Sequence, residues 1–185
     1  MEDKKKVILK AATCLIAEKG FHETTTSNIA KEAQVAVGTI YNYFSTKEDI
    51  LGQIFALAYT RRAQTLEEVT LSKMSLQAKL EKFLRIHFQD VLENPNLARL
   101  LMQEMTTSVK EELAPVRNYR SDLAEQLSRM FLSCPNPIDD PFLAGSLALG
   151  SIHAVTFQLV HTQEEWEVED VVKKVSSFIL TGLMG

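Results

Sequence analysis

Apolar residues recur along this chain at intervals of three and four positions, the spacing of α-helices that bury one face. The first such stripe consists of Ile8, Ala11, Ala12, Leu15 and Ile16. The alternation of apolar and polar residues that is typical of β-strands is nearly absent. Comparable patterns predict further helices over 25–33, 37–44, 46–69, 76–91, 95–105, 115–131, 142–161 and 168–179. The sequence therefore predicts an all-α protein of about nine helices.

Helix-end signals support these boundaries. Gly20 is placed to close the first helix as a C-cap. Thr25 is placed to cap the second helix, and Ser45 or Thr46 is placed to cap the long fourth one. Pro95 follows Asn94 at a position that suits the first turn of another helix.

The segment VGTIYNYF, residues 37–44, is unusually rich in hydrogen-bonding side chains for so short an element. Two short helices joined by a tight turn and braced by a third form a helix-turn-helix, whose second helix enters the major groove of DNA. We predict that Ile40 and Phe44 anchor this second helix inward. Val37, Thr39, Asn42 and Tyr43 then face outward; they are groups that suit base edges and phosphates.

This pattern predicts a division of the chain into two domains. We predict a helix-turn-helix DNA-binding domain over residues 1–50 and a helical ligand-binding and dimerisation domain over residues 51–185. The division falls inside the long fourth helix. No internal repeat or low-complexity segment stands out in the sequence.

Composition and charge modify this picture only slightly. Hydrophobic residues make up 45% of the 185 residues, enough for a sizeable core. The formal net charge of −4 gives no global sign of nucleic-acid binding. Two cysteines, far apart in sequence, form no disulfide framework. We expect no stretch long and apolar enough to span a membrane, and we expect a cytoplasmic protein.

No constellation of residues indicates catalysis. The sequence has no glycine-rich phosphate loop, no HExxH and no nucleophile elbow. His153 and His161 lie eight positions apart, so their Cα atoms are about 12 Å apart on one helix, too far to share a metal ion. We therefore expect neither an enzyme nor a cofactor or metal.

The segment from Ile8 to Leu51 resembles the DNA-binding part of the TetR family of bacterial transcriptional repressors. The matching stretches, in order and at the family's spacing, are ILKAATCLIAEKGF, the pair Thr24-Thr25, IAKEA, V-GTIYNYF and KEDIL. The resemblance covers about a quarter of the chain. It implies repression of transcription by a homodimer that binds a palindromic DNA operator and is released by a small apolar molecule.

The resemblance also implies roles for particular residues. Lys47 matches a lysine that approaches phosphate, and Thr25 and Tyr43 would hold phosphates as well. Tyr41 sits at a position where the family nearly always has tyrosine, and it would be both packed and bonded to phosphate. The residues that approach bases would be Val37, Gly38, Thr39 and Asn42.

Two departures from the family pattern affect the turn. Gln34 stands where the family usually has glycine, and a non-glycine residue at positive φ is uncommon. Ala36 stands where a hydroxyl cap is usual, which would cost about 1 kcal/mol. An alternative hypothesis rests on these departures, namely a sensor or carrier of apolar molecules that no longer binds DNA.

The helix at 142–161 is apolar almost all round, so it must be buried on more than one side. A stripe of small residues along it would permit close approach of another helix. Together with the amphipathic final helix it predicts a four-helix interface in a two-fold dimer, which is where the family dimerises. The predicted interface residues are Ala144, Ala148, Ser151, Ala154, Val171, Val175 and Phe178. A central helix of a monomeric bundle is the alternative.

If the family arrangement holds, the middle helices bring large apolar residues to a shared interior that is a candidate pocket. These residues are Phe83, His87, Phe88, Leu101, Met102, Met105, Tyr119, Leu123, Phe131 and Phe157. The alternative is a filled core. Within the family, GTIYNYFSTKEDIL is most similar to regulators of fatty-acid degradation, which implies a long-chain acyl-coenzyme A effector. Arg99 or Arg117 would then meet its phosphates. Aromatic cations, with Glu104 as counter-charge, are the alternative ligands.

Overall fold

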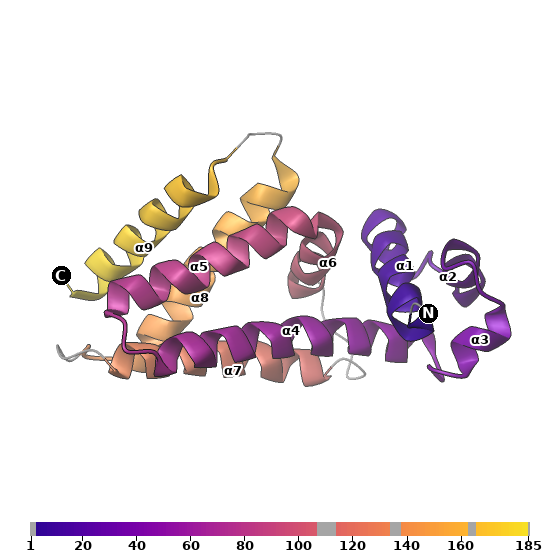
Figure 1. Ribbon diagram of the computed structural model, residues 1–185, viewed down its shortest axis with the longest axis horizontal. Helices are drawn as coiled ribbons and strands as arrows, with labels where there is room; N and C mark the ends of the chain where they lie inside the picture. Colours follow the sequence, from indigo (N-terminus) through magenta and orange to yellow (C-terminus); the bar gives the residue numbers. More distant parts are fainter. Residues whose placement is uncertain (1–2, 107–113, 134–137, 163–165, 185) are drawn as a thin grey trace. The chain divides into compact units, whose positions relative to one another are not determined.

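The computed structural model describes residues 3–106, 114–133, 138–162 and 166–184, and within these ranges it describes no side chains for 104–106, 114–120, 183 and 184. The described residues contain helices and connecting segments but no strand, which confirms the predicted fold class (Figure 1). In order, the helices are α1 (Lys4–Lys19), α2 (Thr26–Glu32), α3 (Val37–Tyr41), α4 (Lys47–Leu71), α5 (Leu76–Glu93), α6 (Pro95–Thr106), α7 (Ala114–Leu132), α8 (Pro141–His161) and α9 (Val168–Met184).

Side-chain caps fix many of the helix ends. The hydroxyl of Thr25 accepts a hydrogen bond from the backbone N–H of Asn28, and the Asn28 side chain accepts one from the backbone N–H of Thr25. This reciprocal pair satisfies two amide groups that the first turn of a helix leaves unpaired. Ser75 caps α5 and Asp140 caps α8 in the same manner, each accepting from an N–H three residues onward.

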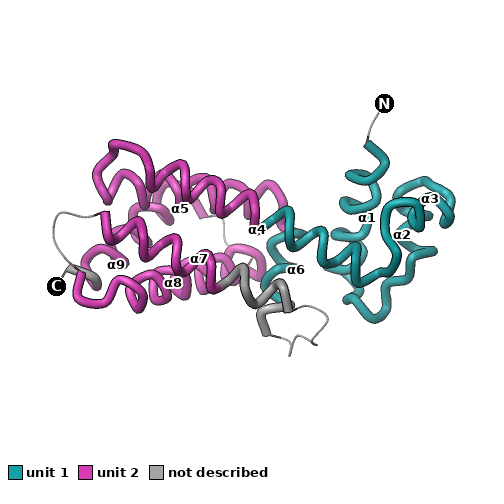
Figure 2. Tube along the Cα trace, turned by 90° about the horizontal axis from the view of Figure 1, so that it is seen from below, with its two compact units in different colours: residues 1–58, 96–116 teal, residues 59–95, 117–185 magenta. Residues whose placement is uncertain are grey.

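The chain divides into two compact units, coloured separately in Figure 2. Unit 1 comprises residues 1–58 and 96–116, and unit 2 comprises 59–95 and 117–185. α4 contributes its first half to unit 1 and its second half to unit 2, because the division falls after Ala58. The domain boundary near residue 50 that the sequence suggests stays a prediction.

Unit 1 contains α1, α2 and α3, with α1 packed on α2 and α2 packed on α3. Ile8 and Ile16 from α1, Ile29 from α2 and Ile40 from α3 are at most 1% exposed. Burying branched aliphatic side chains of this size contributes about 1.5–3 kcal/mol each. The apolar stripes read from the sequence therefore form the core that holds the two short helices.

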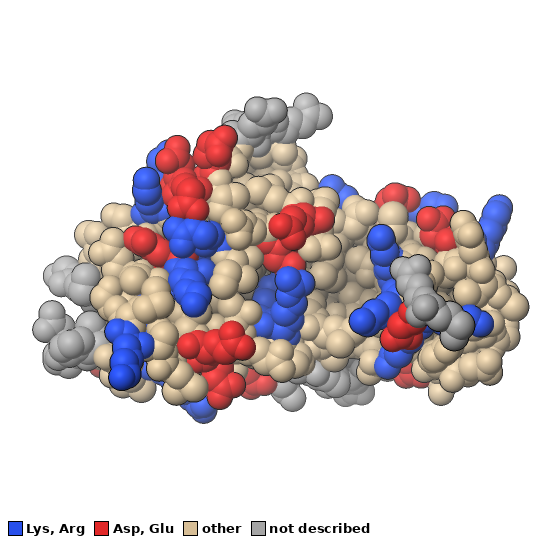
Figure 3. All heavy atoms as spheres, viewed as in Figure 1, with Lys and Arg blue, Asp and Glu red and all other residues tan. Residues whose placement is uncertain are grey.

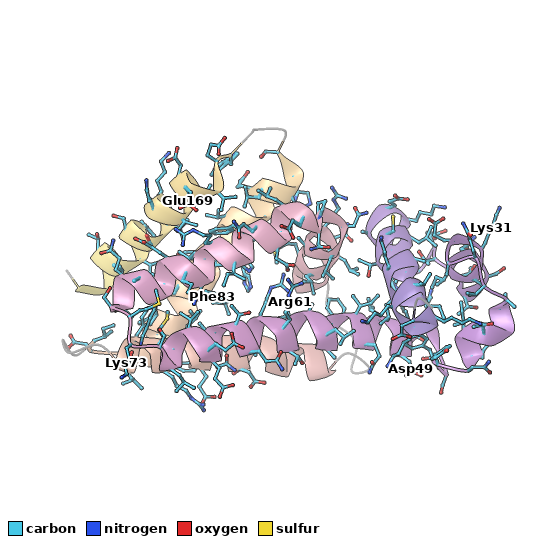
Figure 4. The ribbon with its side chains drawn as sticks, viewed as in Figure 1. Lys31, Asp49, Arg61, Lys73, Phe83 and Glu169 are labelled. Carbon is cyan, nitrogen blue, oxygen red and sulfur yellow. The ribbon has the colours of Figure 1, made fainter. Side chains whose placement is uncertain are left out.

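Unit 2 places α5 against both α8 and α9, and α8 against α9. The apolar stripe of α5 is buried, with Leu80, Leu84 and Phe88 fully enclosed. Arg85 of α5 also donates two hydrogen bonds to the carboxylate of Glu169 on α9, at 2.6 and 2.8 Å. Glu169 is labelled in Figure 4. This pair lies at the surface, where a bidentate geometry still contributes only modestly to stability.

We expected no stretch long and apolar enough to span a membrane, and by length and composition that expectation was wrong. Among the described residues, the helix Pro141–His161 is long and apolar enough to do so, and 39% of its most apolar window is buried in the chain. The core helix of a soluble protein passes the same test, because any helix buried on several sides must be apolar on several sides.

Candidate nucleic-acid interface and ligand cavity

The turn between α2 and α3 is built by a left-handed residue. Gln34 has a φ of 53°, so a non-glycine residue adopts the left-handed conformation in this turn. The N–H of Gln34 donates to the carbonyl of Lys31 at 3.2 Å, and the N–H of Val35 donates to the carbonyl of Ala30 at 2.9 Å. These two bonds form a Schellman motif, which ends α2 and turns the chain toward α3.

Replacing Gln34 with Gly is expected to stabilise the protein by about 1 kcal/mol. The left-handed conformation costs a residue with a Cβ about 1–2 kcal/mol, and the greater freedom of glycine in the unfolded chain cancels part of the gain. Thermal unfolding followed by circular dichroism should show a Tm higher by about 2–4 °C. Gln34→Ala is the control, since it keeps the strain. A Gln34→Gly variant no more stable than wild type would contradict this account of the turn.

α3 presents an exposed polar surface on two buried anchors. Ile40 is 0% and Phe44 is 3% exposed, which confirms their inward placement, whereas Tyr41 is 55%, Tyr43 is 44% and Val37 is 40% exposed. Thr39 is partly exposed, and Gly38 has open space around its Cα.

The predicted helix over 37–44 is shorter in the structure. α3 ends at Tyr41, and Asn42 is its C-cap, with its N–H donating to the carbonyl of Ile40. Ala36, the N-cap, provides no side-chain hydrogen bond, as the sequence predicted. The hydroxyl of Tyr41 lies 3.3 Å from that of Thr26, so α2 helps to fix the direction of this tyrosine. Asn42 and Tyr43 therefore extend from the end of α3, just past its last turn.

Thr25 and Lys47 both have structural partners as well as the phosphate roles expected of them. Thr25 is the N-cap of α2. The ammonium of Lys47 donates to the carbonyls of Phe21 at 2.6 Å and Thr24 at 2.8 Å, and it lies 4.2 Å from the centre of the Phe21 ring. An ammonium has three N–H donors, so one remains for a phosphate oxygen. Lys47 thus ties the segment after α1 to the start of α4.

Charge does not single out this surface. Lys and Arg residues are interspersed with Asp and Glu over the face drawn in Figure 3. Residues 1–50 carry seven Lys and seven Asp or Glu, which sum to zero, so the remaining residues account for the net charge of −4. A surface with this charge pattern would hold DNA through individually placed contacts rather than through a uniformly basic face.

The residues expected to form a shared apolar pocket are divided by the structure. Phe83, His87, Phe88, Leu123 and Phe131 are all buried in unit 2. Leu101 and Met102 are buried but belong to unit 1, so their place in the same pocket stays a prediction. The side chains of Met105, Tyr119, Glu104 and Arg117 lie outside the described residues, and Arg99 donates to the side chain of Asn96 at 3.0 Å.

The structure does not place Phe157 in the shared apolar interior that the sequence predicted. It is 45% exposed and stacks on His161, with ring centres 4.2 Å apart, so it lies on the outer side of α8. The inward position one residue earlier is occupied by Thr156, which is 1% exposed. The periodicity of an almost wholly apolar helix does not distinguish these two sides.

The structure also differs in part from the predicted dimer interface. Ala144, Ala148, Val171 and Val175 are all less than 9% exposed within the chain itself, so they present little surface to a partner. Gly145 of α8 faces α7 instead, because a Cβ at this position would clash with the carbonyl oxygen of Ala124. Ser151 is half-buried, whereas Ala154 is exposed and Phe178 is 71% exposed.

A polar cluster that the sequence did not predict lies between α4 and α5. Arg61 and Arg62 of α4 both approach the carboxylate of Asp90 on α5, at 3.1 and 3.6 Å. Burial lowers the pKa of the Arg62 guanidinium, and the charge of Asp90 opposes that change. The only sequence signal was the adjacent pair of arginines, because its carboxylate partner lies on a different helix.

His87 adjoins the same cluster. Its Nε2 lies 2.9 Å from the hydroxyl of Thr156, while its Nδ1 is buried without a hydrogen-bond partner in the described structure. Burial lowers the pKa of His87 well below its usual range, and the charges of Arg62 and His153 lower it further. His87 is therefore neutral at pH 7, and one of its ring nitrogens can still accept or donate a hydrogen bond.

Three comparisons with known proteins agree with this geometry. Residues 8–54, which cover most of α1, all of α2 and α3 and the start of α4, match the family "Bacterial regulatory proteins, tetR family". The chain is 39% identical over 101 residues to the "Fatty acid metabolism regulator protein" of Bacillus subtilis (strain 168), covering 55% of this chain and 52% of that protein. It is 47% identical over 51 residues to the "HTH-type transcriptional regulator HbdR" of Aromatoleum sp. (strain CIB), covering 28% of this chain and 22% of that one. The aligned segments thus span about half of the first curated relative and less of the second.

Solved structures resemble the chain over nearly its whole length. The fatty acid degradation regulator FadR from Bacillus halodurans superposes with a TM-score of 0.88 at 26% identity, covering 100% of this chain and 98% of that one. The transcriptional regulator FadR from Bacillus subtilis, in complex with stearoyl-CoA, has a TM-score of 0.84 at 27% identity, covering 96% and 98%.

The fold and the exposed side chains of α3 thus define a helix-turn-helix. The family that residues 8–54 match is the TetR family of bacterial regulatory proteins. The proteins it resembles are named as regulators of transcription or of metabolism, which confirms the expectation that it is not an enzyme.

Proposed function

We propose that the protein is a cytoplasmic transcriptional repressor that binds a palindromic DNA operator as a homodimer. The observation that carries this proposal is the set of exposed side chains around α3, namely Val37, Thr39, Tyr41, Asn42 and Tyr43, held on the buried anchors Ile40 and Phe44. Asparagine pairs with adenine through two hydrogen bonds, and apolar groups such as valine contact the thymine methyl. Tyrosine hydroxyls suit phosphate oxygens.

A second copy of the chain supplies the other half of the palindrome. The outer side of α8 carries an apolar stripe at helical spacing, formed by Leu143, Leu147, Gly150, Ala154 and Phe157, and Phe178 projects from α9. Exposed apolar stripes of this kind mark interfaces between proteins. A two-fold axis pairs the same surface on both copies, and it sets the two recognition helices about 34–36 Å apart, or a multiple of that spacing.

The effector in this proposal is a long-chain acyl-coenzyme A. The Bacillus subtilis regulator to which the chain is similar was solved with stearoyl-CoA, and the interior of unit 2 is lined with large apolar residues. Burying a twelve-carbon chain contributes up to about 10 kcal/mol before the costs of binding. A preference of about 2.7 kcal/mol for the form that does not bind DNA would weaken operator binding about 100-fold.

The test is a titration of the protein–operator complex followed by fluorescence anisotropy, using the DNA upstream of its own gene. Palmitoyl-coenzyme A is expected to release the protein at micromolar concentration, whereas acetyl-coenzyme A is not, because it lacks the apolar chain. Rhodamine 6G serves as the aromatic cation. Release by the cation alone would contradict the acyl-coenzyme A assignment. Release by none of the three ligands would show that long-chain acyl-coenzyme A is not the effector.

A second candidate function is that of a sensor or carrier for apolar molecules that does not bind DNA. Two observations favour it, the φ of 53° at Gln34 and the missing side-chain cap at Ala36, since both weaken the frame of α3. The same anisotropy assay separates the two functions. Binding of palmitoyl-coenzyme A without any salt-sensitive binding of the upstream DNA would support the carrier over the repressor.

A further inference from the structure

A polar cavity lies in unit 2, between the last turns of α4 and the second half of α7. Its volume is about 180 Å³, which is room for several water molecules or for one small organic molecule. None of its walls comes from the residues predicted for the apolar pocket. The wall residues are Glu67, Thr70 and Leu71 of α4, and Gln126 and Arg129 of α7.

Two buried polar atoms in these walls lack a hydrogen-bond partner. They are Oγ1 of Thr70 and Oε1 of Gln126, two of the three side-chain atoms in this state among the described residues. Buried polar atoms are nearly always paired, so two unpaired ones at a single cavity point to a partner for both. A carboxamide oxygen only accepts hydrogen bonds and a hydroxyl oxygen can accept them, so that partner is a donor. The end torsion of a glutamine side chain is soft, which lets Gln126 turn its oxygen toward a donor in the cavity.

The carboxylate of Glu67 adds a negative charge at the rim. Among the described residues Glu67 forms no ion pair, whereas the guanidinium of Arg129 is paired with the carboxylate of Glu125 at 2.7 Å. The pair of Arg129 and Glu125 is neutral as a whole. Glu67 therefore sets the sign of the charge at the cavity, and that sign favours a cation.

A buried lysine fixes the two helices next to the cavity. Nζ of Lys79, on α5, donates to the backbone carbonyl of Thr70 at 2.7 Å and to Oγ of Ser133, directly after α7, at 3.3 Å. Both partners lie at helix C-termini, each of which carries about half a negative elementary charge. The two helix ends therefore offset the charge of Lys79, and the charge of Glu67 remains for a ligand.

We propose that this cavity binds a small primary ammonium ion. Such an ion has three N–H donors and no acceptor. The three acceptors at the cavity are Oε1 of Gln126, Oγ1 of Thr70 and the carboxylate of Glu67. The alkyl part of the ligand lies along Leu71, which is 78% exposed at the edge of the cavity. This second ligand site does not depend on the proposed acyl-coenzyme A effector.

Titration of ¹⁵N-labelled protein with n-butylammonium chloride at pH 7, followed by NMR, tests the site directly. The resonances of Thr70 and of the side-chain amide of Gln126 are expected to shift at millimolar ligand. Glu67→Gln and Gln126→Leu are each expected to weaken binding about tenfold, because each removes one acceptor for the ammonium. Gln126→Leu also removes a buried unpaired oxygen, so its Tm should equal or exceed that of the wild type.

Glu68→Gln is the matched control, because it removes the same charge from the neighbouring exposed residue, which lies outside the cavity walls. It should bind n-butylammonium like the wild type. Butyltrimethylammonium keeps the charge but has no N–H donor, and butan-1-ol keeps the chain but has no charge, so neither should shift the Gln126 resonances. Three results would overturn the proposal: equal loss of binding in Glu68→Gln and Glu67→Gln, equal binding of either comparison ligand, or no shift with n-butylammonium, which is the result for a cavity that holds only water.

Discussion

Leu147→Glu is expected to convert the protein into a monomer and to lower its affinity for a palindromic operator by about 100- to 10,000-fold, the usual loss when two linked contacts become one. Leu147 is 59% exposed in the middle of the apolar stripe of α8, so the single chain tolerates a charge there. In the proposed dimer two symmetry-related carboxylates would be buried close together without partners. Sedimentation velocity and operator titration measure the two effects.

Leu132→Glu is the control for this experiment. Leu132 is 66% exposed at the end of α7, so the substitution adds the same charge at a similarly exposed leucine outside the stripe. It should sediment like the wild type. A Leu147→Glu variant that stays a dimer and binds the operator normally would show that the apolar side of α8 is not the interface. Ala148→Glu is not a useful probe, because Ala148 is 1% exposed and the charge would disrupt the chain itself.

Asn42→Ala is expected to cost about 1–3 kcal/mol on the cognate operator and to relax the preference at one base pair, since a bidentate contact to adenine is lost. Lys47→Ala should weaken binding to all sequences similarly and reduce the salt slope by about one for each protomer. Binding selections over randomised operators, repeated at several salt concentrations, measure both effects.

Lys47 needs its own control, because its ammonium also holds the carbonyls of Phe21 and Thr24. Lys47→Ala should therefore lower the Tm without DNA, while Asn42→Ala should leave it unchanged because Asn42 is exposed. Lys73→Ala removes the same charge from an exposed position in unit 2, and it should alter neither property (Figure 4). A change of base preference in Lys47→Ala, with none in Asn42→Ala, would reverse the assigned roles.

The sequence alone determined the helices, most of their ends and the helix-turn-helix. Spacing at three and four positions defines which residues share a face, and a helix with one apolar face has only one way to bury it. This is why Ile40 and Phe44 were placed inward correctly, and why Thr25 was recognised as a cap. The left-handed turn at Gln34 was also predictable, because the family pattern places glycine at that position.

The end of α3 was less predictable. The apolar spacing of Ile40 and Phe44 continues the helical pattern, but the structure ends α3 at Tyr41. Residues after a helix can keep helical spacing of buried side chains for one more turn while the backbone leaves the helix. The side chains of Asn42 and Tyr43 remain exposed, so the predicted contact surface is kept although the element is shorter.

Only the tertiary structure decided which side of α8 faces inward. An almost wholly apolar helix has no polar face to exclude, so periodicity could not tell that Ala148 is buried while Leu147 and Phe157 are exposed. The same limit concealed the cluster of Arg61, Arg62 and Asp90, whose members meet across two helices. Spacing along one helix reports which of its residues lie on the same side. Which side meets which neighbour depends on how the helices pack, and that is a property of the folded chain as a whole.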